Sequence, residues 1–455
     1  MKLTSEDAEE TSGWGGESAF GSFLRQYLDR EVAIVLAVAL VPRLLFMLLV
    51  PAYIRSVDAT NWETVGGLMD QGQNPYQTTT LLNWPPFWMQ IIFVLSKMAH
   101  AYGIQFFHLL QIFLMTVEAG VIILLIKLIR EVAPTARVRA IALAGIALNP
   151  AAIFLTCQHG NFDVMVGFWV LLFILGFTRY NRSGEASDWL CACLFLGLGI
   201  LTKTVPLILV PMLAGGFRRV TFPFRLVGTA LVFGPVTLAM SVIYVLSPAD
   251  VAEKVIGYRS IPGFFGIPGL FQQLGAGNLI WLYNGIFYLA LLVTLAGTAA
   301  FFWRRGTIGG REGVLYTAML LAAVPVFGPG YATQYLYWCL PLLVATYAFF
   351  EGRWRIFLTA FGFVAALTYL YLCCLTEPEG CLLVNLWLTR GIEVPTFQFL
   401  SQLNSPTSRF LFTLPLFFCY LALIGLGISM LSKYVKASNA RISPPAQGTG
   451  SISSS

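Results

Sequence analysis

The stretch VAIVLAVALVPRLLFMLLV, residues 32–50, decides the class of this protein. It is long enough to cross the hydrocarbon core of a bilayer as a helix and carries one charge, Arg43. The whole chain has the same character: 57% of its 455 residues are hydrophobic and 11% are charged, against about 25% charged in soluble domains. A water-soluble core cannot bury so much apolar surface. We therefore predict an all-α polytopic membrane protein, without a cleavable signal peptide because its first thirty residues are polar and acidic.

Basic residues predict the orientation of the spans. Sixteen of the 28 lysines and arginines fall into six groups: Arg130/Arg137/Arg139, Arg179/Arg182, Arg218/Arg219/Arg225, Arg304/Arg305/Arg311, Arg353/Arg355 and Lys433/Lys436/Arg441. If these groups and the N-terminus face the cytoplasm, the positive-inside rule holds throughout. The net charge of +6 then reflects loop topology and not nucleic-acid binding.

This orientation predicts about twelve transmembrane helices with both chain ends inside. They are expected at 32–52, 105–128, 140–157, 163–178, 188–202, 205–217, 226–246, 279–303, 314–328, 335–350, 356–375 and 410–431. Segment 85–103 cannot span without inverting everything after it, so we interpret it as a juxtamembrane helix in the outer interface. An ordinary span, compensated later in the chain, is the alternative.

Three regions follow from this division. They are a cytoplasmic N-terminal segment (1–30), a transmembrane domain (31–432) whose first outer loop (53–104) holds juxtamembrane helices, and a disordered cytoplasmic tail (433–455). Cysteines in apolar runs are expected to pack in the core. Cys373, Cys374 and Cys381 cluster near a loop, where two of them are candidates for one disulfide.

Two charges lie within predicted spans. Counted from the inner membrane surface along antiparallel helices, Arg43 and Glu118 both reach a depth of about 15 Å. The pattern favours a buried ion pair between neighbouring helices. A proton or ion pathway is the alternative, although few other intramembrane charges are present to form a relay.

Most other unusual polar residues are predicted on the outer face, where a functional site is therefore expected. Asp58 follows the first span directly, ahead of the rival carboxylates Glu63 and Asp70. It can cap the following helix, or it can act as a general base whose pKa rises because lipid removes its hydration.

A second outer segment, HGNFD, places His159, Asn161 and Asp163 in one turn. A plain two-helix turn with Asp163 as a helix cap is one interpretation, and a site for substrate is the other. The spacing does not support a metal, because the chain offers no HxxxH or DxD pattern here.

Two outer cations suit a phosphate. Lys203 lies between short helices and either extends to the interface or contacts phosphate, and Arg259 lies between flexible glycines beside Tyr258. The stretch GPGYATQYLYW (328–338) supplies Gln334 and Tyr335. Its aromatic residues can form an interfacial belt, but an amide and tyrosines also suit contact with a sugar or a lipid headgroup.

In this order, these segments resemble the GT-C superfamily of polytopic glycosyltransferases over most of the chain. The resemblance rests on the acidic Asp58 after the first span, the GxNPY segment ending in Tyr76, and NWPPFW at the start of the juxtamembrane helix. It also rests on HGNFD, LTKTVPLILVP and GYATQYLYWCLPLL, which are similar to segments of the mannosyltransferase-like branch, including the enzyme that first mannosylates glycosylphosphatidylinositol.

The resemblance implies a GT-C-like fold and transfer of one sugar, mannose or another hexose, from a polyprenyl- or dolichyl-phosphate donor. The acceptor would be lipid-linked or a glycan on the outer or lumenal face. Asp58 would be the general base of an inverting reaction. Lys203, Arg259 and Tyr258 would hold the donor phosphate, while sugar or acceptor contacts would come from His159, Asn161, Asp163, Gln334, Tyr335 and Tyr76. The missing DxD leaves metal use and mannose open.

Other classes remain possible from the sequence. A polytopic transporter or flippase of a lipid-linked or small polar substrate is the main alternative, followed by a non-catalytic lipid-binding protein and an outer-face acyltransferase. Transporters favour internal repeats and paired polar sites near the midplane. The sequence instead collects its polar residues at one face. We expect a multi-pass protein of the bacterial plasma membrane, in preference to the endoplasmic reticulum, with its site on the periplasmic or lumenal side.

Overall fold

The computed structural model describes residues 29–50, 55–80, 82–130, 135–256, 265–306, 310–372 and 405–442. Within these ranges the regular elements are helices, and no β-strand is formed. This agrees with the predicted all-α class. A helix satisfies its backbone hydrogen bonds within its own segment, which the bilayer interior demands.

The described helices form three groups along the chain. Before the third candidate span they are α2 (Arg30–Leu49), α3 (Val57–Asp70), α4 (Pro75–Thr78), α5 (Pro86–Tyr102), α6 (Phe106–Arg130), α7 (Ala136–Ala147), α8 (Pro150–Phe154) and η1 (Leu155–His159). The next group is α9 (Asp163–Ser183), α10 (Ala186–Thr202), η2 (Val205–Leu213), α11 (Ala214–Arg219), α12 (Phe222–Leu246), α13 (Pro248–Val251) and η3 (Ala252–Ile256). The last group is α14 (Gly266–Gln273), η4 (Gly277–Leu279), α15 (Ile280–Arg305), α16 (Gly310–Phe327), η5 (Thr333–Tyr335), α17 (Leu336–Phe349), α18 (Arg353–Leu370) and α21 (Pro406–Ile442).

Each of the twelve predicted spans coincides with a helical segment, but not all are long enough to cross alone. Among the described residues, seven helices are long and apolar enough to span a membrane, or eight if α7 and the segment Pro150–His159, which meet at a 42° bend, form one span. The bundle is therefore that of an integral membrane protein, and the count of twelve stays a prediction. Helix α5 is not among the candidate spans, as expected for a juxtamembrane helix.

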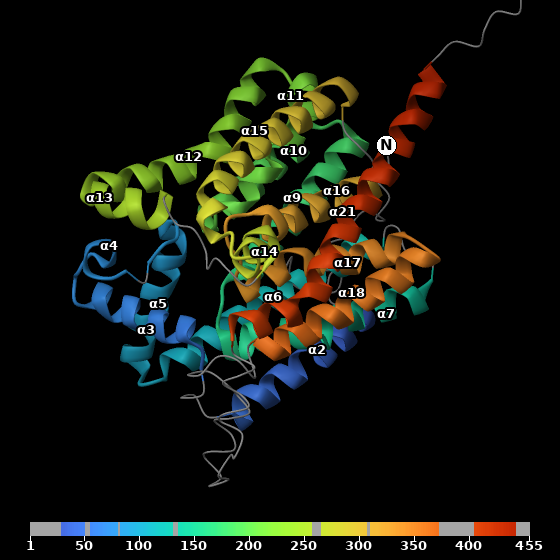
Figure 1. Ribbon diagram of the computed structural model, residues 1–455. Coiled ribbons are helices and arrows are strands. Elements are labelled where there is room, and N and C mark those ends of the chain that lie inside the picture. The colour runs from blue at the N-terminus through green and yellow to red at the C-terminus, as the bar shows by residue number, and fades with distance from the viewer. Residues whose placement is uncertain are drawn as a thin grey trace, which may run out of the picture.

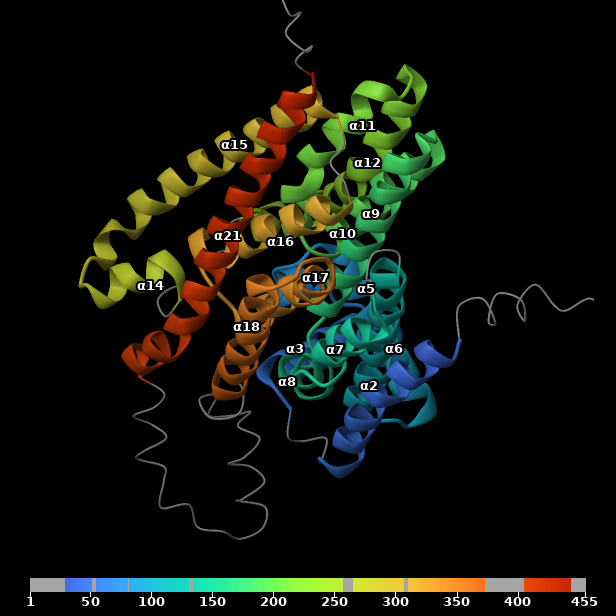
Figure 2. The ribbon, with the colours of Figure 1, turned by 90° about the vertical axis from the view of Figure 1, so that its right-hand side faces the viewer.

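The bundle has a buried centre and a lipid-facing rim. Helix α9 is the most enclosed candidate span and contacts α6, α10, α16 and α17. At the rim, α2, α12, α15 and α21 expose most of their apolar surface, and Figures 1 and 2 show them on the outside of the bundle. In water such surface would be costly, whereas in lipid it needs no cover.

The juxtamembrane helices form a compact unit on one side of the bundle. Helix α3 packs along α5, and both lie at the left of Figure 1 beside α4. Three buried rings join this unit to the bundle: Trp62 and Trp88 meet edge to face at 5.9 Å, and Phe162 stacks on Trp88 at 4.7 Å. The aromatic contacts fix α3 against the turn that precedes α9.

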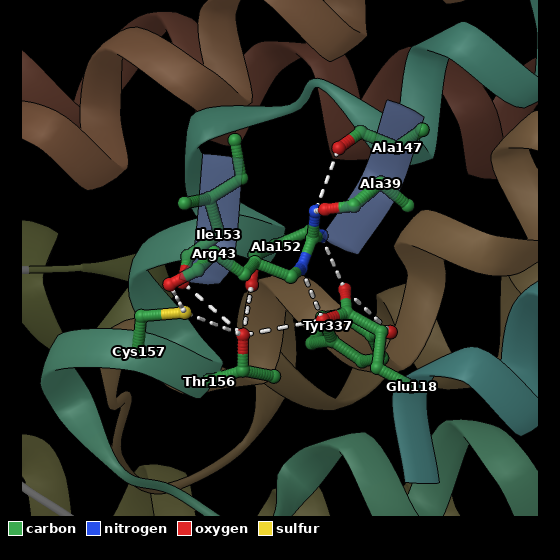
Figure 3. A network of polar contacts seen from close by, with 9 residues as sticks. All are labelled: Ala39, Arg43, Glu118, Ala147, Ala152, Ile153, Thr156, Cys157 and Tyr337. Atoms are coloured by element: carbon green, nitrogen blue, oxygen red, sulfur yellow. Dashed lines mark hydrogen bonds and ion pairs between the residues drawn. The ribbon is translucent and has the colours of Figure 1, made fainter. Parts of the chain in front are cut away.

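The predicted pair between the two intramembrane charges is confirmed. Arg43 and Glu118 are fully buried and form a bidentate pair, with Nε to Oε2 at 2.6 Å and Nη2 to Oε1 at 2.7 Å. Arg43 also donates to the carbonyls of Ala39 and Ala147, while Thr156 donates to Glu118 at 3.1 Å (Figure 3). The pair therefore joins α2, α6, the end of α7 and η1.

Helices α2 and α6 are also joined at one end. Arg130 donates to Asp29 at 2.7 Å and to Glu31 at 2.9 Å, and Arg139 reaches Glu31 at 3.2 Å. Asp29 also caps α2 by accepting from Val32. Helix α2 has 20 residues, so about 30 Å separates this charged end from the end that leads to Asp58.

The structure also bears on the predicted tail and on the cysteines. Helix α21 continues to Ile442, beyond residue 433 where the tail was expected to begin. Cys157, Cys193 and Cys339 are buried as free thiols, whereas Cys191 is exposed. The possible disulfide among Cys373, Cys374 and Cys381 lies outside the described residues.

Removing one partner of the buried pair should destabilise the protein strongly. We expect Glu118→Leu alone to cost about 3–5 kcal/mol, because it leaves the Arg43 guanidinium buried without its counter-charge. The double variant Arg43→Met/Glu118→Leu should recover much of this loss. Thermal unfolding of the purified protein in detergent measures both, and a double variant no more stable than the single one would contradict the pairing argument.

Candidate functional site

The site is built around the turn between η1 and α9. Residues Leu155–His159 form a single π-helical turn, a feature often found at functional sites, which ends at Gly160 with a φ of 64°. A Cβ at Gly160 would lie 3.1–3.3 Å from Leu110, Ala59 and Phe107. Glycine is therefore required here both by its left-handed backbone and by the space around it.

Helix α3 holds the backbone of this turn. The Ser56 hydroxyl donates to the carbonyl of His159 at 2.5 Å, and the Trp62 indole donates to the carbonyl of Gly160 at 3.2 Å. Ser56 is also the N-cap of α3, accepting from the backbone N–H of Ala59. The interpretation of Asp58 as the cap is therefore wrong, and its carboxylate is available for another role.

Asp58 faces the turn. Its Oδ2 receives Nδ2 of Asn161 at 2.7 Å and lies 3.0 Å from Nε2 of His159, while no hydrogen bond from the described residues reaches Oδ1. Nδ1 of His159 lies 2.9 Å from the Tyr369 hydroxyl. A neutral ring that donates from Nε2 to the carboxylate accepts at Nδ1, so Tyr369 and Asp58 together favour one tautomer.

The expected rise in the pKa of Asp58 is wrong in direction. Burial does raise it, but the hydrogen bonds from His159 and Asn161 and the charge of Lys203 outweigh burial and hold the pKa below the ordinary carboxyl value. The side chain keeps 29% of its surface exposed. Asp58 is thus an ionised, oriented carboxylate at neutral pH.

Lys203 lies directly after α10 and is almost completely buried. Its Nζ donates to Oδ1 of Asp163 at 2.7 Å. Four aromatic rings surround the ammonium at 4.5–5.2 Å: Trp84, Phe162, Tyr335 and Trp338. Burial lowers the pKa of Lys203 below that of an ordinary lysine, against the attraction of Asp163 and Asp58. The lysine therefore does not extend to the interface.

Asp163 is fully buried and serves as the counter-charge of Lys203. Its Oδ1 also accepts from the Trp338 indole at 2.7 Å, whereas Oδ2 has no hydrogen-bond partner among the described residues. The cap interpretation fails here as well, because the N-cap of α9 is Phe162, and the backbone N–H of Asp163 donates to Oδ1 of Asn161. A buried carboxylate oxygen without a donor is a place for a ligand hydroxyl.

The aromatic stretch at 328–338 is buried inside the protein and is not an interfacial belt. Tyr331, Tyr335 and Trp338 each expose 6% or less of their surface, and Gln334 exposes 8%. Tyr335 stacks on Trp338 with ring centroids 4.0 Å apart. The short helix η5 thereby places this stretch against Lys203, as part of one site.

A cavity of about 410 Å³ opens beside Lys203. Its polar lining comes from Asn83, Trp84, Lys203, Tyr335 and Trp338, and its apolar lining includes Val236, Met240 and Val255 with Tyr288 of α15. Asn83 Oδ1 is buried without a hydrogen-bond partner among the described residues. The cavity thus joins a cation and an unsatisfied acceptor to apolar walls that lead between α12 and α15.

Comparison with known proteins gives one similar solved structure to report. It is a crystal structure of ArnT from Cupriavidus metallidurans bound to undecaprenyl phosphate, 15% identical to this chain, with a TM-score of 0.44. The match covers 87% of this chain and 77% of that one. No protein-family model matches the sequence, and no curated protein matches it either.

The structure brings together most residues that the sequence selected. Asp58, His159, Asn161, Asp163, Lys203 and Tyr335 are joined by hydrogen bonds or ring contacts. Tyr76 lies elsewhere: its hydroxyl donates to the carbonyl of Trp84, and its ring lines a second cavity. Tyr258 and Arg259 lie outside the described residues.

Sequence reasoning missed two contributors. Tyr369 comes from the last turn of the apolar helix α18, where nothing in the sequence marks it as a partner of His159. Trp338, grouped with belt aromatics, donates to Asp163.

Among the described residues no three histidine, cysteine, aspartate or glutamate side chains are grouped as metal ligands.

Gly160 and Gly184 both have a positive φ. Comparing substitutions at the two glycines distinguishes the cost of backbone strain from the cost of a crowded side chain. Gly160→Ala and Gly184→Ala both place a side chain at positive φ, which costs about 1–3 kcal/mol. Only Gly160 also lacks space, because nothing lies within 4 Å of a Cβ at Gly184. We expect the larger drop in melting temperature for Gly160→Ala, and equal drops would contradict the close approach of α3 and the turn.

Proposed function

We propose that this protein is a GT-C-type glycosyltransferase that moves a single sugar, mannose or another hexose, from a polyprenyl-phosphate donor to a lipid-linked or glycan acceptor. One observation carries the proposal. An ionised carboxylate, Asp58, and a buried ammonium, Lys203, belong to one polar site beside a cavity with apolar walls. The order of the sequence segments that resemble this superfamily supports the same conclusion.

The charge distribution supports a site on the outer or lumenal face. Arg130 and Arg139 lie at the opposite end of α2 from Asp58, and the positive-inside rule assigns such basic groups to the cytoplasm. A donor lipid can then lie in the outer leaflet. Its tail would leave the cavity between α12 and α15, past Met240 and Tyr288.

Lys203 suits the donor phosphate because its charge is held in a place that water hardly reaches. Such a charge stabilises a developing anion more strongly than an exposed lysine does. Asp58 and Asp163 nevertheless give the described site two negative charges against one positive. A phosphate therefore calls for a second cation, and Arg259 is the sequence candidate for that role.

The proposed reaction uses the free oxygen of Asp58. Oδ1 accepts the proton of the acceptor hydroxyl while the acceptor oxygen forms a bond to the anomeric carbon. The bond from that carbon to the phosphate oxygen breaks on the opposite face, so the configuration inverts and the electrons remain on the phosphate. His159 and Asn161 hold Oδ2, which orients the carboxylate. Asp163 Oδ2 and Asn83 Oδ1 offer acceptors for sugar hydroxyls.

A transporter or flippase would place its substrate groups near the midplane. There, Arg43 and Glu118 are paired with each other and fully enclosed. This closed pair favours the enzyme over the carrier.

Removal of the base should separate chemistry from binding. We expect Asp58→Asn to lower the turnover of a polyprenyl-phosphate sugar by about 10²–10⁴-fold, because the amide cannot accept the proton. Release of polyprenyl phosphate by purified protein, tested with a panel of radiolabelled donors, measures this. Binding of the donor should persist.

The matched control is Glu63→Gln on the same helix, since Glu63 pairs with Arg55 and is partly exposed. It should keep nearly full turnover. If the wild type released no polyprenyl phosphate from any donor and Asp58→Asn lost donor binding instead, the protein would be a carrier and the proposal would be contradicted.

The lowered pKa values predict the shape of the pH profile. Because Asp58 stays ionised below the ordinary carboxyl range, kcat/KM should persist into mild acid and fall only when Asp58 is protonated. On the alkaline side, Lys203 should lose its charge before an ordinary lysine, whose pKa is about 10.4. Lys203→Arg should move this alkaline limb to higher pH, because arginine stays charged. An alkaline limb that does not move would exclude Lys203 as its source.

A further inference from the structure

A second, larger cavity lies on the other side of α12 from the Lys203 cavity. It has a volume of about 860 Å³ and lies between the juxtamembrane unit and the end of α12, where Figure 1 shows α12 and α13 over α4 and α5. We propose that it binds a membrane lipid with an uncharged, hydroxyl-rich head, of the glycosyl-diacylglycerol class. This inference does not depend on the proposed transferase activity.

One wall of the cavity is continuous with the lipid-facing surface. Ala239, Val242 and Leu246 line it from α12, and Val242 and Leu246 are 53% and 61% exposed. Phe87 and Phe93 of α5 form the opposite wall. Side chains that face both the cavity and the bilayer allow an acyl chain to enter from the membrane without crossing water.

Amide side chains also line the cavity. Gln73, Gln77 and Gln90 line it and are exposed. Gln77 donates to the carbonyl of Leu246 at 3.1 Å, and Gln90 makes no side-chain hydrogen bond to any described residue. An amide both donates and accepts, which matches the hydroxyl groups of a sugar. The cavity therefore offers both apolar side chains and amide groups, the two kinds of contact that a glycolipid needs.

Charge decides between kinds of lipid head. Among the described residues no acidic or basic side chain lines this cavity, and the nearby Lys254 ammonium is already engaged by the carbonyl of Tyr76 and by Asp250. A phosphate placed here would lose hydration without gaining a counter-ion. This contrasts with the Lys203 cavity, where the cation is part of the lining. A neutral head is the complementary occupant.

One wall of the protein separates the two cavities. Met240 lines the first and Ala239 the second, so adjacent residues of α12 face different cavities. Pro85 and Pro86 divide in the same way, and Tyr76 braces this segment through the carbonyl of Trp84. A bound lipid would therefore stiffen the wall beside Lys203 without entering that site.

Lipid retention tests the proposal directly. The full-length protein is reconstituted in phosphatidylcholine nanodiscs with equal amounts of monoglucosyl-diacylglycerol and phosphatidylglycerol of the same chains, then extracted and examined by native mass spectrometry. We expect bound glycolipid in the wild type and a loss of about tenfold in Ala239→Trp, which places an indole in the cavity. Leu238→Trp is the matched control, because Leu238 is 70% exposed on the same helix and does not line the cavity.

A second variant guards against misfolding of the tryptophan variant. Gln90→Leu keeps the volume but removes the amide, and should lower glycolipid retention about threefold to tenfold without lowering the melting temperature. Any retained phosphatidylglycerol should depend on Lys203 and not on Ala239. Equal retention of both lipids at this cavity, or equal losses in Ala239→Trp and Leu238→Trp, would overturn the proposal.

Discussion

The bidentate pair between Arg43 and Glu118 is the contact on which the rest of the arrangement depends. In a bundle interior an unpaired charge is very costly, so the two helices that carry the pair can meet in one register only. Glu118 also accepts from Thr156 in the π-helical turn and from Tyr337 of α17. The two segments that deliver His159 and Trp338 to the site are therefore tied to the same buried anion.

Electrostatic balance explains why the site looks as it does. Burial alone would neutralise both Asp58 and Lys203, because it disfavours the charged form of each. For Asp58 the donors on the turn reverse that tendency, whereas for Lys203 burial prevails. The result is an ionised carboxylate at Asp58 and a buried Lys203 ammonium whose charge is supported by Asp163. The faces of the aromatic rings take the place of water around the ammonium and stabilise its charge through cation–π interactions.

The two cavities beside α12 differ in chemistry. A cation lines one cavity and amides line the other, while α12 separates them with adjacent residues. Val242 and Leu246 of α12 belong both to its exposed surface and to the wall of the larger cavity. The two cavities thus differ both in charge and in volume, about 860 Å³ against about 410 Å³.

The sequence by itself determined the helical membrane class, the positions of the helical segments, the Arg43–Glu118 pair and the gathering of Asp58, HGNFD and Lys203. Hydropathy and charge placement are local properties, and they carry this information because the bilayer constrains helix length and orientation. Only the tertiary structure decided the direction of the Asp58 pKa shift, the partnership of Lys203 with Asp163 and the role of Tyr369. These depend on donors that come from distant helices, and the sign of each effect is set by a competition between burial and hydrogen bonding that requires three-dimensional neighbours. No spacing along the chain records that competition.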